Sequence, residues 1–253
     1  MRLVRVLSQR QVFYGIFAGS DIELLRGEPF ERLERKFVSV TANKVTFLPP
    51  VAPSKVVAVG LNYLDHAREL SMELPTEPIL FLKPPSSVIG PGAAIVYPAS
   101  SREVHHEAEL AVVIGKRARN VAVGRAFEHV LGYTCANDVT ARDLQRRDGQ
   151  WGRAKSFDTF CPLGPYIETE LEPDSLAIKA RVNGQTRQDS STAQMIFPVA
   201  KLISFISEVM TLEPGDVILT GTPPGVGEVH VGDDVEVEIG GIGVLRNSVE
   251  SGS

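Results

Sequence analysis

Residues 105–115 read His-His-Glu-Ala-Glu-Leu-Ala-Val-Val-Ile-Gly. The apolar run that ends at Gly115 is typical of a buried strand. Side chains two residues apart in a strand point the same way, so Glu107 and Glu109 are expected on one face, about 6.6–7 Å apart along the chain. Two carboxylates beside a buried strand repel each other, so one must be protonated or a cation must neutralise both. The stretch therefore predicts β structure that carries a cation site.

Similar short apolar runs follow one another through the chain from residue 55 onward. Gly and Pro interrupt nearly every gap between them, and residues 235–245 alternate at period two on both sides of a Gly turn. This spacing favours a mainly β, α+β fold with a folded-over antiparallel or mixed sheet rather than a doubly wound one. The expected strands are 56–59, 79–82, 94–97, 110–114, 130–135 and 217–220.

The chain divides in sequence into a small N-terminal β module, residues 1–50, and a main domain, residues 51–253. Alternating apolar residues predict hairpin strands in the module, and the stiff segment 48–53, Leu-Pro-Pro-Val-Ala-Pro, predicts the linker. One helix is expected after Pro198, because apolar residues recur on one helical face up to Met210.

Composition narrows the possible partners. Lys and Arg total 26 against 31 Asp and Glu, and the net charge of −5 argues against nucleic acid or an anionic membrane as partner. No stretch approaches the roughly 20 apolar residues of a membrane span. Cys135 and Cys161 are too few for a disulfide framework and are expected to fill the core. These features predict a cytoplasmic protein with a small-molecule ligand.

A third acid, Asp138, follows the apolar run 130–135, where a strand should end and a turn or short helix should begin. Three carboxylates without cysteine suit a hard cation, Mg²⁺ or Mn²⁺, better than zinc. His105 and His106 are expected behind the ligands or at the surface. Spacing alone also fits a plainer interpretation, in which the two glutamates form the solvent face of an amphipathic strand.

Three ordered motifs resemble the signatures of the fumarylacetoacetate hydrolase family. They are residues 105–115, residues 132–143 (Gly-Tyr-Thr-Cys-Ala-Asn-Asp-Val-Thr-Ala-Arg-Asp) and residues 219–227 (Leu-Thr-Gly-Thr-Pro-Pro-Gly-Val-Gly). The resemblance covers roughly residues 52–250. It implies a mixed β-sandwich roll, a homodimer, and metal ligation by Glu107, Glu109 and Asp138.

Two further matches point to one branch of that family. Residues 60–69, Gly-Leu-Asn-Tyr-Leu-Asp-His-Ala-Arg-Glu, resemble the lid of its acylpyruvase and oxaloacetate decarboxylase members. Residues 154–157 resemble the lysine motif of those members, which implies a catalytic role for Lys155. His66 and Glu69 are three residues apart, so on a helical turn the carboxylate would orient the imidazole and raise its basicity.

The resemblance also implies residues that contact the substrate. Arg142 and Gln145 match contact positions in related members, and Gly221 and Thr222 match a loop near the bound ligand. The run Arg146-Arg147 is expected in a solvated loop, although one guanidinium there could clamp a substrate carboxylate.

Together these residues predict an enzyme that cleaves a carbon-carbon bond of a small 2-oxo acid with Mg²⁺ or Mn²⁺. The reaction would be acylpyruvate hydrolysis, oxaloacetate decarboxylation or both, through a metal-stabilised enolate. The main alternative is an isomerase or decarboxylase of the 2-hydroxyhepta-2,4-diene-1,7-dioate type in aromatic acid catabolism. A noncatalytic module with a structural Ca²⁺ is the third possibility. The sequence does not separate the first two.

Overall fold

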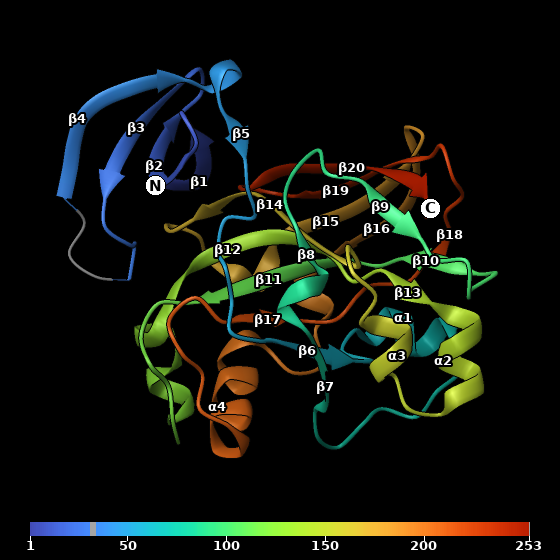
Figure 1. The fold of residues 1–253 in the computed structure, drawn as a ribbon. Helices are drawn as coiled ribbons and strands as arrows, with labels where there is room; N and C mark the ends of the chain where they lie inside the picture. Colours follow the sequence, from blue (N-terminus) through green and yellow to red (C-terminus); the bar gives the residue numbers. More distant parts are fainter. Residues whose placement is uncertain (31–33, 253) are drawn as a thin grey trace.

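The computed structural model describes residues 1–30 and 34–252 and consists mainly of strands, which confirms the predicted fold class. Most strands belong to one large mixed sheet (Figure 1). Its order is β4 (Glu34–Thr41), β3 (Asp21–Arg26), β2 (Gln11–Ala18), β1 (Arg2–Ser8), β14 (Cys161–Glu168), β12 (Val130–Asn137), β11 (Ala108–Ile114), β17 (Val217–Leu219), β6 (Val56–Gly60) and β7 (Ile79–Lys83), with β5 (Thr46–Phe47) on β1 and β8 (Val88–Ile89) on β14.

Two smaller sheets complete the β structure. A five-stranded sheet has the order β16 (Gln185–Ser191), β15 (Ala177–Val182), β19 (Asp234–Ile239), β20 (Gly243–Ser251) and β9 (Ile95–Tyr97). A three-stranded sheet consists of β13 (Thr140–Ala141), β10 (Val104–His106) and β18 (Gly227–Glu228). The helices are α1 (Leu64–Glu69), α2 (Arg142–Asp148), α3 (Gly152–Lys155) and α4 (Val199–Val209), with 3-10 turns at Ala42–Lys44, Pro85–Ser87, Val123–His129, Pro173–Ser175 and Thr192–Gln194.

The large sheet packs on the five-stranded sheet around strand β11, whose residues are all buried. Leu110 and Val112 share one apolar cluster with Ile178 of β15 and Val237 of β19. Burying each such side chain contributes about 1.5–3 kcal/mol. β11 is antiparallel to β12 and β17, and β17 is parallel to β6, so the sheet is mixed as expected.

The N-terminal strands extend the large sheet. β1 pairs with β14 in the register Leu3↔Ile167, while β2, β3 and β4 continue outward from β1. These strands lie at the upper left of Figure 1, and the proline-rich segment 48–53 leads from β5 to β6. The division of the chain near residue 50 stays a prediction.

Helix α4 was predicted, and a turn or short helix was expected after Asp138, where α2 begins at Arg142; helix α3 was not predicted. The buried residues of α4 include Val199, Leu202 and Ile206, and it lies below the large sheet in Figure 1. The prediction of a loop around Arg146 and Arg147 was wrong, because both residues belong to α2. Such short helices depend on tertiary anchors more than on periodicity. Leu144 of α2 and Ala154 of α3 provide these anchors, since both are buried in one cluster.

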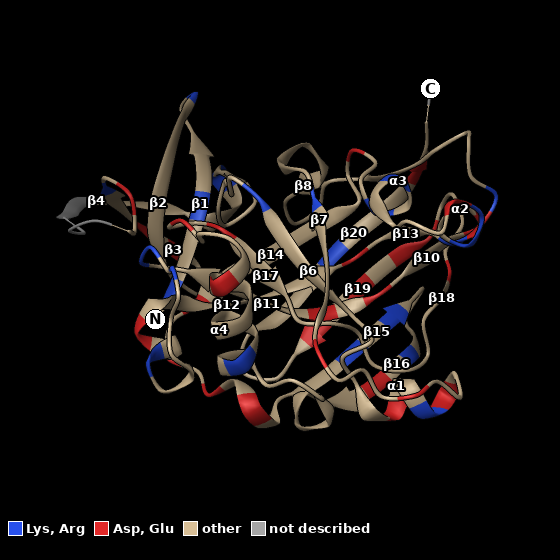
Figure 2. Ribbon diagram, turned by 90° about the horizontal axis from the view of Figure 1, so that it is seen from below, with Lys and Arg blue, Asp and Glu red and all other residues tan. Residues whose placement is uncertain are grey.

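Charged residues of both signs are distributed over the strands and helices (Figure 2). On the five-stranded sheet Arg181 lies 2.6 Å from Glu238, and Lys179 lies 3.1 Å from Asp189. Cross-strand pairs of opposite sign stabilise a sheet only slightly. None of the helices in the described part of the chain has the length and apolar character that crossing a bilayer requires.

Asp216 is the buried charge that ties β6 to β17. One carboxylate oxygen accepts hydrogen bonds from the Ser54 hydroxyl at 2.6 Å and from the amides of Ser54 and Lys55 at 3.1 and 3.2 Å. The other accepts the Glu213 amide at 2.8 Å and pairs with the Lys55 ammonium. The side chain is fully buried, so these donors lose their acceptor if the carboxylate is removed.

We therefore expect Asp216→Ala to lower the free energy of unfolding by about 3 kcal/mol, because it leaves a partly buried ammonium and several amides unpaired. Urea denaturation followed by circular dichroism measures this loss. The control is Asp189→Ala, which removes an exposed ion pair and should cost less than about 1 kcal/mol. Equal losses in the two variants would contradict the role given to Asp216.

Candidate functional site

Three buried carboxylates meet where β11 and β12 pair. Glu109 lies in β11, Glu107 occupies the single residue between β10 and β11, and Asp138 follows the end of β12. The Asp138 amide donates to the Glu107 carbonyl at 2.9 Å, which brings the two acids together. Carboxylate oxygens from all three residues lie within 4.8 Å of one another. The two glutamates were expected within one strand; they converge although Glu107 lies just outside β11.

Three cationic side chains surround this cluster. The Lys155 ammonium lies 2.9 Å from Glu107 Oε2 and 2.6 Å from Asp138 Oδ2. Arg142 donates to Glu107 Oε1, and Lys83 Nζ lies 2.5 Å from Asp138 Oδ1. Each acid except Glu109 therefore has a direct cationic partner among the described residues.

The electrostatics set Glu109 apart from its neighbours. Burial and the charges of Asp138 and Glu107 raise the pKa of Glu109 well above its usual value. Burial would also raise the pKa of Glu107, but Lys155 and Arg142 outweigh it and hold that pKa far below normal. Burial would lower the pKa of Lys155, yet Asp138 and Glu107 raise it. The cluster therefore holds one carboxylate whose charge is not compensated locally.

This arrangement fits a divalent cation. The oxygens converge closely, the donor set contains only carboxylates, and a hard cation such as Mg²⁺ or Mn²⁺ prefers such ligands. Among the described residues Glu109 accepts one hydrogen bond, from the Gly221 amide at 2.7 Å, and has no direct ion pair, so an added positive charge would meet an uncompensated acid. Glu107, Glu109 and Asp138 are the residues that would hold it.

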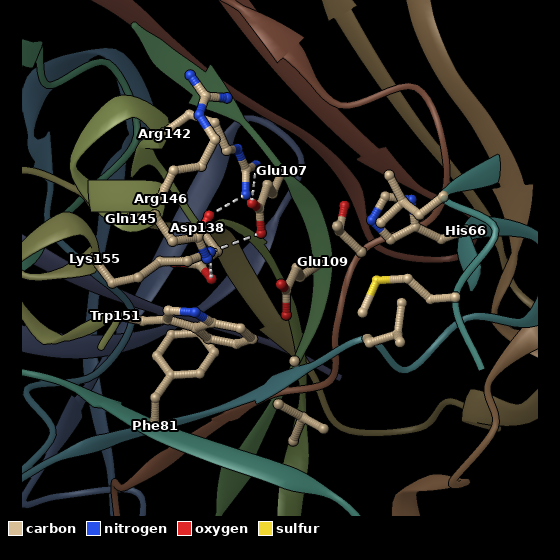
Figure 3. A pocket seen from close by; sticks show the side chains of 16 residues that line it. His66, Phe81, Glu107, Glu109, Asp138, Arg142, Gln145, Arg146, Trp151 and Lys155 are labelled. Carbon is tan, nitrogen blue, oxygen red and sulfur yellow. Dashed lines mark hydrogen bonds and ion pairs between the residues drawn. The ribbon is translucent and has the colours of Figure 1, made fainter. Parts of the chain in front are cut away.

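A cavity of about 300 Å³ opens above the carboxylates (Figure 3). One wall carries polar side chains from α2 and α3, and the other walls are largely apolar. The lining residues are Val59, Gly60, Leu61, His66, Leu70, Met72, Phe81, Glu107, Glu109, Asp138, Arg142, Gln145, Arg146, Trp151, Lys155 and Thr222.

His66 of α1 reaches the cavity from the side opposite Lys155 (Figure 3). Its Nδ1 lies 2.8 Å from Glu69 Oε2, and the other oxygen of Glu69 accepts the Gly225 amide at 3.1 Å. Asp65 receives the Ser190 hydroxyl at 2.5 Å, which ties α1 to β16. The ring is therefore held through Nδ1, and Nε2 is the atom left for chemistry in the cavity.

The remaining predicted substrate contacts fall in two places. Arg142 NH1 donates to Gln145 Oε1 at 2.6 Å, and both side chains line the cavity. Thr222 also lines it, and its hydroxyl donates to the Ala108 carbonyl at 2.9 Å. Gly221 lies behind Glu109, with a φ of +93°, and a Cβ there would come within 2.7 Å of Asn62 Cβ. Glycine is therefore required where the chain passes the carboxylate.

Three residues of the site were not predicted. Lys83 is fully buried against Asp138, and its sequence signal is a lysine that directly continues the apolar run 79–82. Phe81 and Trp151 form an aromatic wall, with ring centroids 5.3 Å apart and an edge-on arrangement. A Cβ at Gly60 would come within 2.4 Å of the Trp151 ring, so the glycine leaves room for it. No sequence pattern linked these distant positions.

Comparison with known proteins gives consistent matches along the chain. The family model described as fumarylacetoacetate (FAA) hydrolase C-terminal matches residues 55–250, and one described as Rv2993c-like, N-terminal matches residues 1–50. Oxaloacetate tautomerase FAHD2B, mitochondrial, from Homo sapiens is 50% identical over 220 residues, which cover 82% of this chain and 70% of the relative.

Two solved structures are similar over the whole of both chains. The 5-carboxymethyl-2-hydroxymuconate delta-isomerase from Mycobacterium smegmatis has a TM-score of 0.94 and 45% identity, with 100% of each chain covered. The maleylpyruvate hydrolase from Sphingobium sp. SYK-6, in complex with manganese (II) ion and pyruvate, has a TM-score of 0.83 and 32% identity, also with 100% of each chain covered.

Removing one carboxylate should separate metal binding from the rest of the site. We expect Glu109→Ala to weaken Mn²⁺ binding by more than about 100-fold, because a ligand contributes more than the residues behind it. His66→Ala should leave Mn²⁺ affinity within about twofold, since His66 is not among the clustered ligands. Isothermal titration calorimetry measures both. Equal weakening in the two variants, or none in Glu109→Ala, would contradict the ligand set.

Proposed function

Because this chain belongs to the fumarylacetoacetate hydrolase family and is therefore an enzyme, we propose that it converts a small 2-oxo acid with the help of Mg²⁺ or Mn²⁺. The proposed reaction is cleavage of a carbon-carbon bond, by acylpyruvate hydrolysis, oxaloacetate decarboxylation or both. The observation that carries the proposal is the convergence of Glu107, Glu109 and Asp138 beneath a cavity that His66 also lines.

The charges of the site favour an anionic substrate. Three carboxylates face three cations, Lys83, Arg142 and Lys155, so the protein groups alone nearly balance. A divalent cation would add two positive charges and would stabilise the negative charge that develops when a 2-oxo acid becomes an enolate. Lys155 and Arg142 lie at the same end of the cavity and draw the substrate carboxylate towards it.

His66 is the proposed general base. Glu69 fixes its ring through Nδ1 at 2.8 Å, which would orient Nε2 for proton transfer. In hydrolysis, Nε2 removes a proton from the water that attacks the distal carbonyl, and Lys155 stabilises the developing oxyanion. In decarboxylation no water attack is needed, so α1 has only to exclude solvent and position the leaving carboxylate.

The comparisons support this class of chemistry without selecting one reaction. The human relative is named as an oxaloacetate tautomerase, one structural relative as a delta-isomerase, and another as a hydrolase with manganese and pyruvate bound. Tautomerisation or isomerisation is the second candidate, because His66 would also transfer a proton to or from carbon. The noncatalytic alternative with structural Ca²⁺ is set aside, since the relatives are named as enzymes.

The setting of the enzyme is part of the proposal. We propose a homodimer, which the family resemblance implies, and a role in aromatic acid catabolism if the isomerase reaction applies. A reducing compartment such as the cytoplasm suits Cys135 and Cys161, which are both buried and unpaired.

A substrate panel tests the proposal directly. The enzyme is incubated with Mg²⁺ or Mn²⁺ and with acetylpyruvate, oxaloacetate or 2-hydroxyhepta-2,4-diene-1,7-dioate, and products are identified by nuclear magnetic resonance. We expect pyruvate from the first two substrates, and loss of turnover when EDTA removes the metal. A shifted double bond or an enol-to-keto conversion alone would favour the second candidate. Failure with all three substrates and both metals would contradict the proposed function.

His66→Ala should separate hydrolysis from decarboxylation. We expect kcat for acetylpyruvate hydrolysis to fall by about 10²–10⁴-fold, the usual contribution of a general base. Oxaloacetate decarboxylation should fall less, because it needs no activated water. Steady-state kinetics at saturating Mn²⁺ measure both. Parallel losses would mean that both reactions use the same base, and unchanged hydrolysis would remove His66 from the mechanism.

A further inference from the structure

One basic side chain that lines the cavity, Arg146, has no direct contact with the carboxylate cluster among the described residues. Arg142, Gln145 and Arg146 lie three and four residues apart in α2, so they project from one face of the helix, and all three line the cavity. Arg147 projects elsewhere and does not line it. Figure 3 shows Arg146 beside Arg142, with its guanidinium farther from the carboxylates. Arg146 therefore marks the outer end of the polar wall.

The ion pair of Arg146 is the one most easily exchanged. Its guanidinium forms a fork with Glu103, with NH1 3.2 Å from Oε1, and its side chain is 62% exposed. The Arg142 side chain is only 18% exposed and is paired with buried Glu107. Glu103 would keep a neighbour if Arg146 turned away, because His105 Nε2 lies 3.0 Å from it. Exposed ion pairs contribute little stability, so a ligand carboxylate can replace Glu103.

Away from this polar wall the cavity is lined by apolar groups. Phe81 and Trp151 form one wall, and Leu70 and Met72 form another. A ligand bound above the carboxylates would meet the cations of the cluster at its inner end and Arg146 farther out along the same wall, with apolar surface on its other sides. Those conditions suit a planar or short carbon chain with a carboxylate at each end.

We propose that Arg146 binds a second carboxylate of the substrate and makes the enzyme selective for 2-oxo dicarboxylic acids. The inference rests on the proposed function, because it takes the 2-oxo acid end to lie over Glu107, Glu109 and Asp138. A guanidinium binds a carboxylate through two parallel hydrogen bonds, which gives both charge and geometric selectivity. Arg146 is thus a specificity-determining residue and takes no part in bond cleavage.

Matched substrates test this selectivity by kinetics. Succinylpyruvate carries a terminal carboxylate, and its terminal methyl ester has the same length without that charge. We expect the kcat/KM of wild type to be about tenfold higher for the diacid than for the ester. In Arg146→Gln the two kcat/KM values should be nearly equal, because KM for the diacid rises while kcat stays nearly unchanged. Acetylpyruvate, which has no second carboxylate, should react equally with both enzymes.

The control variant is Arg147→Gln. Arg147 is equally exposed, at 62%, and lies on the same helix 3.6 Å from Asp148, but it does not line the cavity. The Arg147→Gln variant should retain the wild-type preference for the diacid over its ester. Arg146→Lys should retain part of it, since charge remains while the fork is lost. An unchanged ratio in Arg146→Gln, or the same loss in Arg147→Gln, would overturn the inference.

Ligand binding can be measured without turnover, so it tests the role of Arg146 separately from the proposed function. Calorimetry on the Mn²⁺-loaded protein compares 2-oxoglutarate with 2-oxopentanoate, which has the same chain length but no distal carboxylate. We expect about tenfold tighter binding of the diacid to wild type and no preference in Arg146→Gln. This result would support the inference even if no substrate of the panel were converted. Equal affinities in wild type would overturn it while leaving the proposed function to the panel.

Discussion

The repulsion among three buried carboxylates is the constraint on which the site depends. Oxygens of Glu107, Glu109 and Asp138 lie within 4.8 Å of one another and are shielded from water, so their charges are costly unless cations lie beside them. Within residues 1–30 and 34–252, cationic side chains pair directly with Glu107 and Asp138, and none pairs directly with Glu109. A metal ion at this place would give Glu109 the adjacent positive charge that it lacks.

Several distant segments meet to satisfy that constraint. Lys83 comes from the edge strand β7, Arg142 from α2 and Lys155 from α3, while the acids lie at the start of β11 and just after the end of β12, two central strands of the large sheet. The short helices α2 and α3 present two of these cations, and their buried anchors hold them on the sheet. Apolar packing and ion pairing therefore both hold α2 and α3 against the sheet, which explains how helices of only a few residues can position these cations.

Most of the local structure and part of the candidate site could be predicted from the sequence. Strands β6, β11, β12 and β17 correspond to visible apolar runs, because buried strands need continuous apolar residues. The pairing of β1 with β14 was not predictable, since it joins Leu3 to Ile167 and depends on long-range register. The acids and His66 were identified through motifs. Lys83 was missed because one lysine after an apolar run looks like the end of an exposed strand.

The arrangement also explains why sequence motifs group enzymes with different reactions. Hydrolysis, decarboxylation and tautomerisation of a 2-oxo acid share an enolate, and in the proposed function the carboxylate cluster would hold the cation that stabilises it. In the proposed function the reactions would be distinguished elsewhere in the cavity, by His66 on α1 and by the outer wall formed by α2, which both line it. These positions belong to short helices whose side-chain directions follow from packing. Motifs around the acids therefore identify the family, whereas on the proposed function the choice of reaction and substrate would depend on residues that approach the cavity from its rim.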